Sequence, residues 1–172
     1  MNDVIRAMKE RRSVRAYQPR QISEEELAQV LEAGLYAPSG RGEQSVYLVA
    51  VQDPAVIARL SQLNAQVMGT KADPFYGAPT VVVVLARKSR FTWVEDGSLA
   101  LGNMMNAAHA LGLGSCWIHR AREVFDSPEG QALLAQWGVP DGCGGVGHCI
   151  LGYPAGDLPA PPPRKEGRVL RV

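Results

Sequence analysis

The clearest alternation of apolar and polar positions in the chain falls between residues 23 and 38, and it has the period of a helix. Apolar side chains recur every three or four residues from Leu27 to Leu35, which places them on one face. Ser23 and Glu26 form a capping box before this run, and Pro38 ends it because proline cannot continue a helix. The segment is therefore predicted to be an amphipathic helix packed on a core.

Other segments alternate between helical and strand-like patterns. The run TVVVVLA at 80–86 is continuous and β-branched, which is typical of a strand buried on both faces. The remaining patterns predict helices at 3–10, 54–68 (capped by Asp53), 96–114 and 127–138, and strands at 45–52, 115–119, 146–154 and 168–172. Because helices and strands interleave, the chain is expected to be α/β or α+β around a central sheet, with residues 1–172 in one domain.

Composition indicates the class of protein to which the chain belongs. With 46% hydrophobic and 20% charged residues, the chain is typical of a folded protein and not of a disordered one. The longest apolar run, residues 78–86, is too short to cross a bilayer, and the N-terminus lacks a secretory pattern. We therefore expect no membrane insertion and a cytoplasmic location. The three cysteines are expected to stay reduced.

Charge is distributed unevenly along the chain. The formal net charge is only +1, yet residues 4–20 carry +5 and residues 164–172 carry +3, which leaves an acidic middle. Nucleic-acid binders usually spread lysine and arginine over a long face. Two short basic clusters at opposite ends instead favour one compact anion, so a small ligand is expected and not nucleic acid.

Two motifs are weighed and set aside. Gly142, Gly144 and Gly147 match G-x-G-x-x-G, but a strand follows them where a dinucleotide fold needs a helix. A second set of residues offers metal-ligand chemistry, but its spacing fits no standard zinc site, so no metal is expected; its members are Cys116, His119, Cys143, His148 and Cys149.

The N-terminal basic cluster places three arginines around one serine, in the stretch RRSVR at 11–15. Guanidinium groups match phosphate oxygens bidentately, and a serine adds a hydroxyl or a main-chain N–H. The alternative is a solvated basic surface at a helix end, where cations are favoured anyway. The cluster alone favours neither reading. Arg164 and Lys165, behind the proline-rich segment 159–163, shift the balance toward a phosphate.

Six segments, in this order, resemble the nitroreductase family of FMN-dependent oxidoreductases. They are RRSVRAY at 11–17, APSGRGEQ at 37–44, FYGAPTVVVVL at 75–85, DGSLALGNMMNAAHALGLGSCWI at 96–118, ILGYP at 150–154 and PPPRK at 161–165. The resemblance implies an α+β fold with a central mixed, mainly antiparallel sheet flanked by helices. It also implies a homodimer with FMN at the subunit interface and a C-terminal strand that crosses to the partner.

The resemblance also implies where the phosphate end of FMN is held. Arg11, Ser13 and Arg15 would contact the phosphate, the ribityl chain and the pyrimidine edge, with Arg12 in the same loop. Arg164 and Lys165 would close on the phosphate. Arg15 would also stabilise the negative charge of the reduced flavin, because a fixed positive charge in a partly dry site favours developing negative charge.

Two further segments would contact the flavin ring system. One comes from the other subunit and comprises Pro38, Ser39, Gly40 and Gln44. The other is Trp117, Ile118 and His119, with a main-chain N–H near His119 facing flavin N5. No side chain is assigned as a dedicated catalytic group, because the flavin performs the hydride chemistry itself.

The implied activity is transfer of a hydride from NADH or NADPH through FMN to a small organic acceptor such as a nitroaromatic or a quinone. The alternative is a flavin-binding or sensing dimer without efficient turnover. The chain departs from the family pattern S-x-N-x-Q-P-W at 40–46, where it has Gly42, Ser45 and Val46. It also lacks room for a long lid insertion, so the acceptor and the preferred nicotinamide nucleotide stay open.

Overall fold

A single four-stranded sheet organises the protein. The computed structural model describes residues 1–172, and its strands are β1 (Val46–Val51), β2 (Thr80–Arg87), β3 (Gly114–Ile118) and β4 (Cys143–Gly152). They lie in the order β1-β2-β4-β3, and every neighbouring pair is antiparallel. The only parallel pairing is an isolated bridge between Ser13 and Ser115. The predicted antiparallel-type sheet is therefore confirmed.

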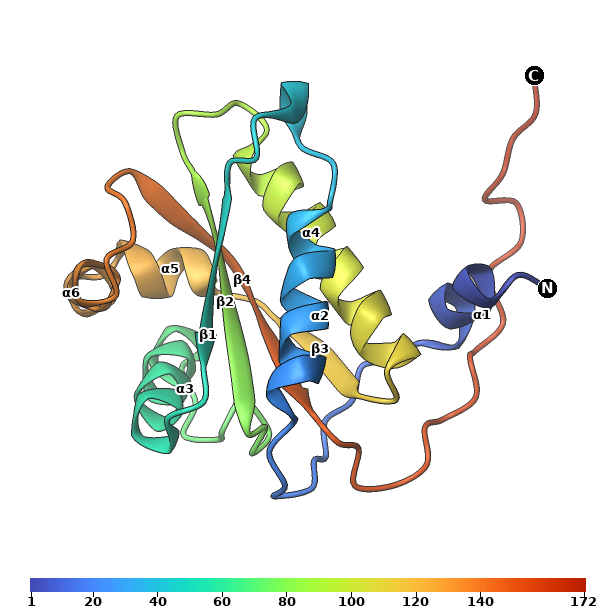
Figure 1. Cartoon of the computed structure of the whole chain (residues 1–172), viewed down its shortest axis with the longest axis horizontal. Helices are drawn as coiled ribbons and strands as arrows, with labels where there is room; N and C mark the ends of the chain where they lie inside the picture. Colours follow the sequence, from blue (N-terminus) through green and yellow to red (C-terminus); the bar gives the residue numbers. More distant parts are fainter.

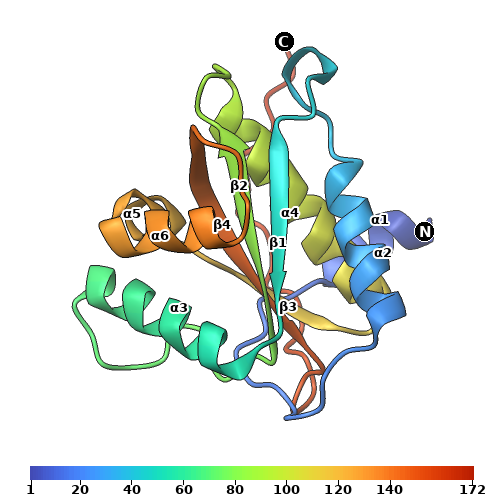
Figure 2. The same ribbon diagram turned by 60° about the vertical axis from the view of Figure 1, so that its left-hand side comes forward.

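Helices cover both faces of this sheet (Figures 1 and 2). On one face lie α2 (Glu24–Leu35) and α4 (Trp93–Ala110), and on the other lie α3 (Pro54–Met68), α5 (Ala121–Asp126) and α6 (Pro128–Gln136). The short α1 (Asp3–Glu10) packs beside α4, and a single 3-10 turn, η1 (Gly40–Gly42), precedes β1. The α+β class is confirmed.

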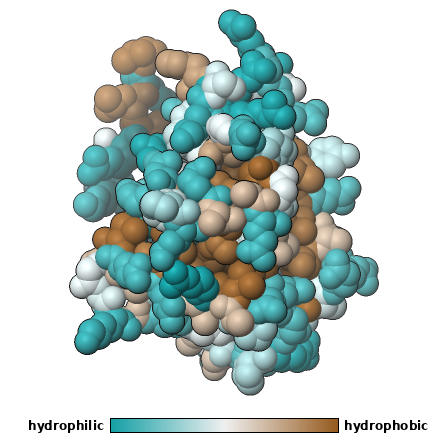
Figure 3. Space-filling model, turned by 90° about the vertical axis from the view of Figure 1, so that its left-hand side faces the viewer, coloured by the Kyte–Doolittle hydropathy of each residue, from teal (hydrophilic) through white to brown (hydrophobic).

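Strand β2 explains why the run at 80–86 has no polar alternation. Val81, Val83 and Leu85 belong to the core under α3, α5 and α6, whereas the alternate residues from Val82 to Ala86 belong to the core under α2 and α4. Both sets are fully buried. Figure 3 shows apolar side chains reaching the middle of the face that carries α3, α5 and α6, with polar side chains around them.

Two predicted caps are confirmed in atomic detail. Ser23 Oγ accepts from the Glu26 N–H, and the Glu26 carboxylate accepts from the Ser23 N–H. Asp53 accepts from two N–H groups at the start of α3, where Pro54 occupies the first position. These are local interactions, so the sequence pattern alone identifies them.

Other boundaries were wrong. Residues 168–172 form no strand within this chain, because nothing in it pairs with them; pairing with a partner stays a prediction. Helix α5 was missed, since its six residues are too few to show a period. Helix α4 begins at Trp93 and ends at Ala110, and β4 begins at Cys143.

The glycine-rich stretch 142–147 lies mainly in β4 and not in a phosphate-binding loop. A side chain at Gly145 would overlap the main-chain carbonyl of Ala121 in α5, and one at Gly147 would lie 2.6 Å from Trp117 Nε1. These glycines therefore allow close packing on both faces of the strand. The rejection of the dinucleotide motif is confirmed by the strand.

Both chain ends lie at the same side of the molecule. Helix α1 has no buried residue, and the segment after β4 passes beside it before running outward (Figure 1). Exposed apolar side chains gather on α1 and on neighbouring parts of α2 and α4: Val4, Ile5, Met8, Leu35, Tyr36 and Leu99. Among the helices, none has the length and apolar character needed to cross a membrane.

Candidate functional site

The free edge of strand β3 is covered by the segment that follows α1. The Val14 N–H donates to the Ser115 carbonyl at 3.0 Å, beside the bridge between Ser13 and Ser115. Val14 packs where a side chain at Gly114 would lie 2.9 Å away, so the glycine lets the segment approach. This contact places the predicted phosphate segment and the predicted ring segment, residues 117–119, at one sheet edge.

A basic pocket lies where the two chain ends meet. It has a volume of about 460 Å³ and is lined by Met8, Lys9, Arg11, Arg12, Pro161, Pro162 and Arg164. The prediction that basic clusters from opposite ends converge is therefore matched by this structure for Arg11, Arg12 and Arg164. Arg15 lies outside this pocket, with its guanidinium 5.9 Å from the ring centre of Tyr76. Lys165 is exposed and does not line the pocket.

The three pocket arginines are not equivalent. Arg12 folds back on α1 and donates to the carbonyls of Lys9 and Glu10, which is the helix-end interaction weighed above. Arg164 donates to the Pro162 carbonyl at 2.8 Å. Arg11 is half-buried, and its Nη1 is a buried donor without any partner in the chain. Arg11 is thus the cation whose bonding is least complete.

Another unpartnered polar atom lies in the same edge strand. Ser115 Oγ is buried and makes no hydrogen bond, whereas Trp117 Nε1, also buried and unpartnered, lies over Gly147 of β4 and beside Leu101 of α4. Buried polar atoms of this kind are rare, because each costs about 1–3 kcal/mol when it loses water without gaining a partner. Together with the basic pocket, Ser115 Oγ fits an anionic ligand that also carries hydrogen-bonding groups. FMN is such a ligand, so the residues present fit it.

The segment 117–119 divides its side chains between the faces of the sheet. Trp117 packs on the α2–α4 side, whereas Ile118 is buried in the other core, so only its main chain could face a cofactor. His119 is exposed, and its carbonyl accepts from Asn64 Nδ2 at 2.8 Å. Arg120, which has a φ of 72°, donates to Asn64 Oδ1 at 3.0 Å. The buried Asn64 therefore fixes the turn after β3.

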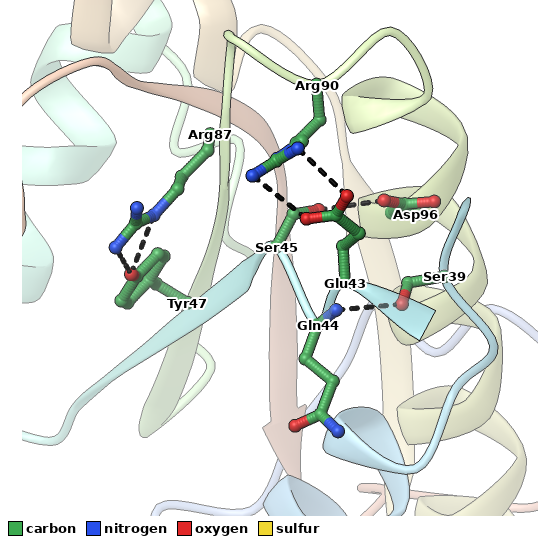
Figure 4. Close-up of polar contacts among 8 residues, drawn as sticks. All are labelled: Ser39, Glu43, Gln44, Ser45, Tyr47, Arg87, Arg90 and Asp96. Atoms are coloured by element: carbon green, nitrogen blue, oxygen red, sulfur yellow. Dashed lines mark hydrogen bonds and ion pairs between the residues drawn. The ribbon is translucent and has the colours of Figure 1, made fainter. Parts of the chain in front are cut away.

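The loop between α2 and β1 has an unusual main chain. Arg41, Gly42 and Gln44 all have positive φ, at 56°, 68° and 48°. The non-glycine residues cost free energy in this conformation, and such positions concentrate at functional sites. Ser39 Oγ accepts from the Gln44 N–H at 2.9 Å, which closes the loop on itself. Pro38 and the Gln44 side chain are exposed, and Gln44 points away from the polar cluster in Figure 4.

A buried aspartate in α4 holds both ends of this loop, and Figure 4 shows its contact with Ser45. The Gly40 N–H donates to Asp96 Oδ1 at 2.9 Å, and Ser45 Oγ donates to Asp96 Oδ2 at 2.8 Å. Burial raises the pKa of Asp96, but hydrogen bonds from Gly40, Ser45 and Thr92 outweigh it, so the pKa lies below its ordinary value. The carboxylate is therefore ionised at neutral pH without a cation beside it.

The predicted loop and the basic pocket do not meet within one chain. Figures 1 and 2 both place η1 at the upper end of the molecule, whereas the segment after α1 crosses its lower half. The two could meet only if the loop of one copy reached the pocket of another, as the resemblance implied.

The residues with metal-ligand chemistry are not brought together. No group of three or more His, Cys, Asp or Glu side chains is arranged to hold a metal ion. Cys116 and Cys149 lie on opposite faces of the sheet, and all three cysteines are free and buried. Burial lowers the pKa of His148 to about 4, and its ring lies 5.2 Å from that of Phe75. His148 is thus a neutral core residue.

Comparison with known proteins decides the family. The sequence profile of the nitroreductase family matches residues 8–74 and 64–153. The chain belongs to the nitroreductase family. A relative from Archaeoglobus fulgidus, named as an NADH dehydrogenase/NAD(P)H nitroreductase, is 32% identical over 90% of this chain and 87% of its own. The NAD(P)H FMN reductase of Bacillus subtilis is 28% identical over 95% of this chain and 70% of its own.

A solved structure agrees with these sequence relatives. The nitroreductase of Bacteroides fragilis, crystallised with bound FMN, superposes with a TM-score of 0.92 and 33% identity, and each chain is covered completely. The family resemblance and the nitroreductase-like fold predicted from sequence are therefore confirmed. The roles predicted for individual residues stay predictions.

Sequence reasoning missed three residues of this site. Asn64 lies within an ordinary amphipathic helix, and Ser115 within a short strand. Asp96 belongs to a segment that carried the resemblance, but nothing in its neighbours indicates a buried carboxylate. A carboxylate in the first turn of a helix usually has a simpler explanation, attraction to the helix N-terminus.

Proposed function

We propose that this nitroreductase-family chain is an FMN-dependent NAD(P)H oxidoreductase that passes a hydride, through flavin N5, from NADH or NADPH to a small acceptor such as a nitroaromatic or a quinone. The observation that carries the proposal is Arg11. Arg11 lines a pocket together with Arg164 from the other end of the chain, and its Nη1 is buried without a partner. A flavin phosphate would give Arg11 an acceptor.

The chain's own residues would bind and orient the flavin. Arg11 and Arg164 would hold the phosphate, with Ser13 and the main chain beside it supplying further donors. Lys165 would help to hold the phosphate, and Arg12 would contribute from its position at the end of α1. Arg15, an exposed residue of the same segment, would stabilise the negative charge of the reduced cofactor. Bound FMN supplies the hydride chemistry itself.

The site is proposed to lie between two copies of the chain. Exposed apolar side chains on α1, α2 and α4 form a surface of the kind that partners cover. The loop 38–44 cannot reach its own basic pocket, so a homodimer would complete two equivalent sites. Residues 168–172, which form no strand here, would then contact the partner. The cytoplasmic location stays a prediction.

A spectroscopic titration tests the proposal. Purified protein with added FMN should show a shifted flavin absorbance and quenched fluorescence, and anaerobic NADH or NADPH should bleach the flavin band. A quinone or nitroaromatic should then restore it and support steady turnover. Binding without turnover would favour the sensing dimer, and absence of flavin binding would contradict the proposal as a whole.

A further inference from the structure

The buried carboxylate of Asp96 needs an explanation beyond the stability of α4. It is 2% exposed and has no lysine or arginine beside it, since the nearby Arg90 is paired with Glu43 at 2.9 Å. A buried carboxylate is costly unless hydrogen bonds satisfy it. Its donors are the Gly40 N–H, the Ser45 hydroxyl and Thr92. Two of the three belong to the loop, so the loop and the carboxylate stabilise each other.

The two loop donors flank the part of the chain with the costly conformation. Arg41, Gly42 and Gln44, which have positive φ, all lie between Gly40 and Ser45. Left to itself, a non-glycine residue would leave the left-handed region, because this conformation brings its Cβ too close to the following carbonyl oxygen. Asp96 fixes the main chain before the turn and the side chain after it, so the turn is held from both ends. Without Asp96, the loop would relax.

Ser45 is where this chain departs from the usual family pattern, which has proline at this position. A proline has neither a hydroxyl nor an N–H to donate. In this chain the serine hydroxyl provides the second bond to Asp96, which fixes the place where the loop enters β1. We call the hydrogen bonds from Gly40 and Ser45 to Asp96 the anchor of the loop. The departure therefore adds a hydrogen bond to this anchor and does not merely remove a contact.

We infer that Asp96 is a positioning residue that holds the 38–45 loop in the conformation that meets the flavin of the partner subunit. The inference rests on the proposed function, because it assumes that FMN lies between two copies. It assigns no contact with the cofactor to Asp96 itself. Its effect is carried by Ser39, Gly40 and the main chain around them.

Single variants test the anchor through the affinity for FMN. Asp96→Ala should weaken FMN binding about 10- to 100-fold, because loss of hydrogen bonds to a charged group is typically of that size. Ser45→Ala should weaken it about threefold to tenfold, by removing one neutral donor to the carboxylate. Ser61→Ala, which removes another serine bonded to an aspartate, Asp73, is the matched control and should bind FMN as the wild type does.

The Ser45 variant keeps the test decisive if Asp96→Ala does not fold. Fluorescence quenching gives the dissociation constant, and thermal unfolding without FMN shows whether the protein is folded. Folded Ser45→Ala with wild-type affinity would overturn the inference. So would folded Asp96→Ala with wild-type affinity.

A heterodimer tests whether the loop acts across the interface. One copy carries Asp96→Ala, and the other carries Arg11→Met with Arg164→Met; two affinity tags allow the mixed dimer to be isolated. If the loop contacts the partner's flavin, one site contains all three substitutions and the other contains none. The mixed dimer should then bind one FMN with wild-type affinity and leave the second site weak.

Each result of this experiment has one meaning. If the loop serves its own subunit's flavin, both sites carry a lesion, no site has wild-type affinity, and the inference is overturned. If the wild-type protein itself binds no FMN, the proposed function fails before the inference is reached. The two failures are therefore distinguished by the wild-type titration alone.

Discussion

The 38–45 loop and the basic pocket are both predicted to hold one cofactor, yet they are built in opposite ways. The loop is anchored inside its own chain, by Asp96 on α4 at 2.8–2.9 Å. The pocket is assembled from two chain ends, and Arg11 leaves a buried nitrogen without a partner. The comparison indicates that one half of the site is formed in advance, whereas the other half gains its bonds from the ligand.

The largest expected effect lies in the pocket. Combining Arg11→Met with Arg164→Met should weaken FMN binding about 100- to 10,000-fold, because each of the two charged hydrogen bonds is typically worth about 1.5–3 kcal/mol. The same pair of changes should leave the thermal stability of the protein without FMN equal or higher, since Arg11 Nη1 has no internal partner and Arg164 loses only exposed bonds to the nearby Pro162 carbonyl.

Titration of FMN and thermal unfolding measure the two effects separately. Lys71→Met, which removes an exposed cation outside the pocket, is the control and should alter neither. A large loss of stability without FMN would show that the pocket arginines are structural, and the contrast with the loop would disappear.

The next effect lies in the loop. In Gly40→Ala the new methyl group would overlap the Thr92 hydroxyl, so the loop should shift. We expect about tenfold weaker FMN binding, with a loss of about 1–3 kcal/mol of stability from overpacking.

Thr92→Ala removes the overlap and should rescue the substitution. Adding Gly40→Ala to Thr92→Ala is expected to cost less than twofold in FMN affinity, as measured by a double-mutant cycle. Equal losses in both backgrounds would mean that the loop position does not depend on this contact.

The smallest effect is the pH dependence of the anchor. Because the folded pKa of Asp96 lies below its ordinary value of 3.8, its contribution to stability is present above that value and is lost as pH falls through the folded pKa. Asp96→Asn should be destabilised by about 1–3 kcal/mol at neutral pH, and the difference from wild type should shrink below about pH 4.

Denaturant unfolding at several pH values measures this difference. The neighbouring charges, Glu43 and Arg90, form their own exposed ion pair, whose contribution is shared by both proteins and cancels. The two proteins differ only at Asp96, so the difference between their pH profiles reports on the loop. A constant difference between the two proteins from neutral pH down to acid would contradict the assigned anchor.

The features that could be predicted from the sequence are mainly those that depend on residues close together in the chain. The caps at Ser23 and Asp53 and the doubly buried strand β2 depend on neighbours in sequence, so their patterns were sufficient. The meeting of the basic ends was predicted from charge alone. Asp96 could not be found, because its partners Gly40 and Ser45 lie more than fifty residues away. The segment 168–172 alternates like a strand but finds no edge to pair with in one chain.

Strand β2 is prone to aggregate with other chains before folding is complete. Seven successive residues at 80–86 are without charge, and five of them are valine or threonine, which is the composition of segments that stack into intermolecular sheets. Pro79 and the pair Arg87 and Lys88 border the run on its two sides. Such flanking residues hinder the addition of further chains. They therefore protect the most aggregation-prone segment of the chain until β1 and β4 pair with it.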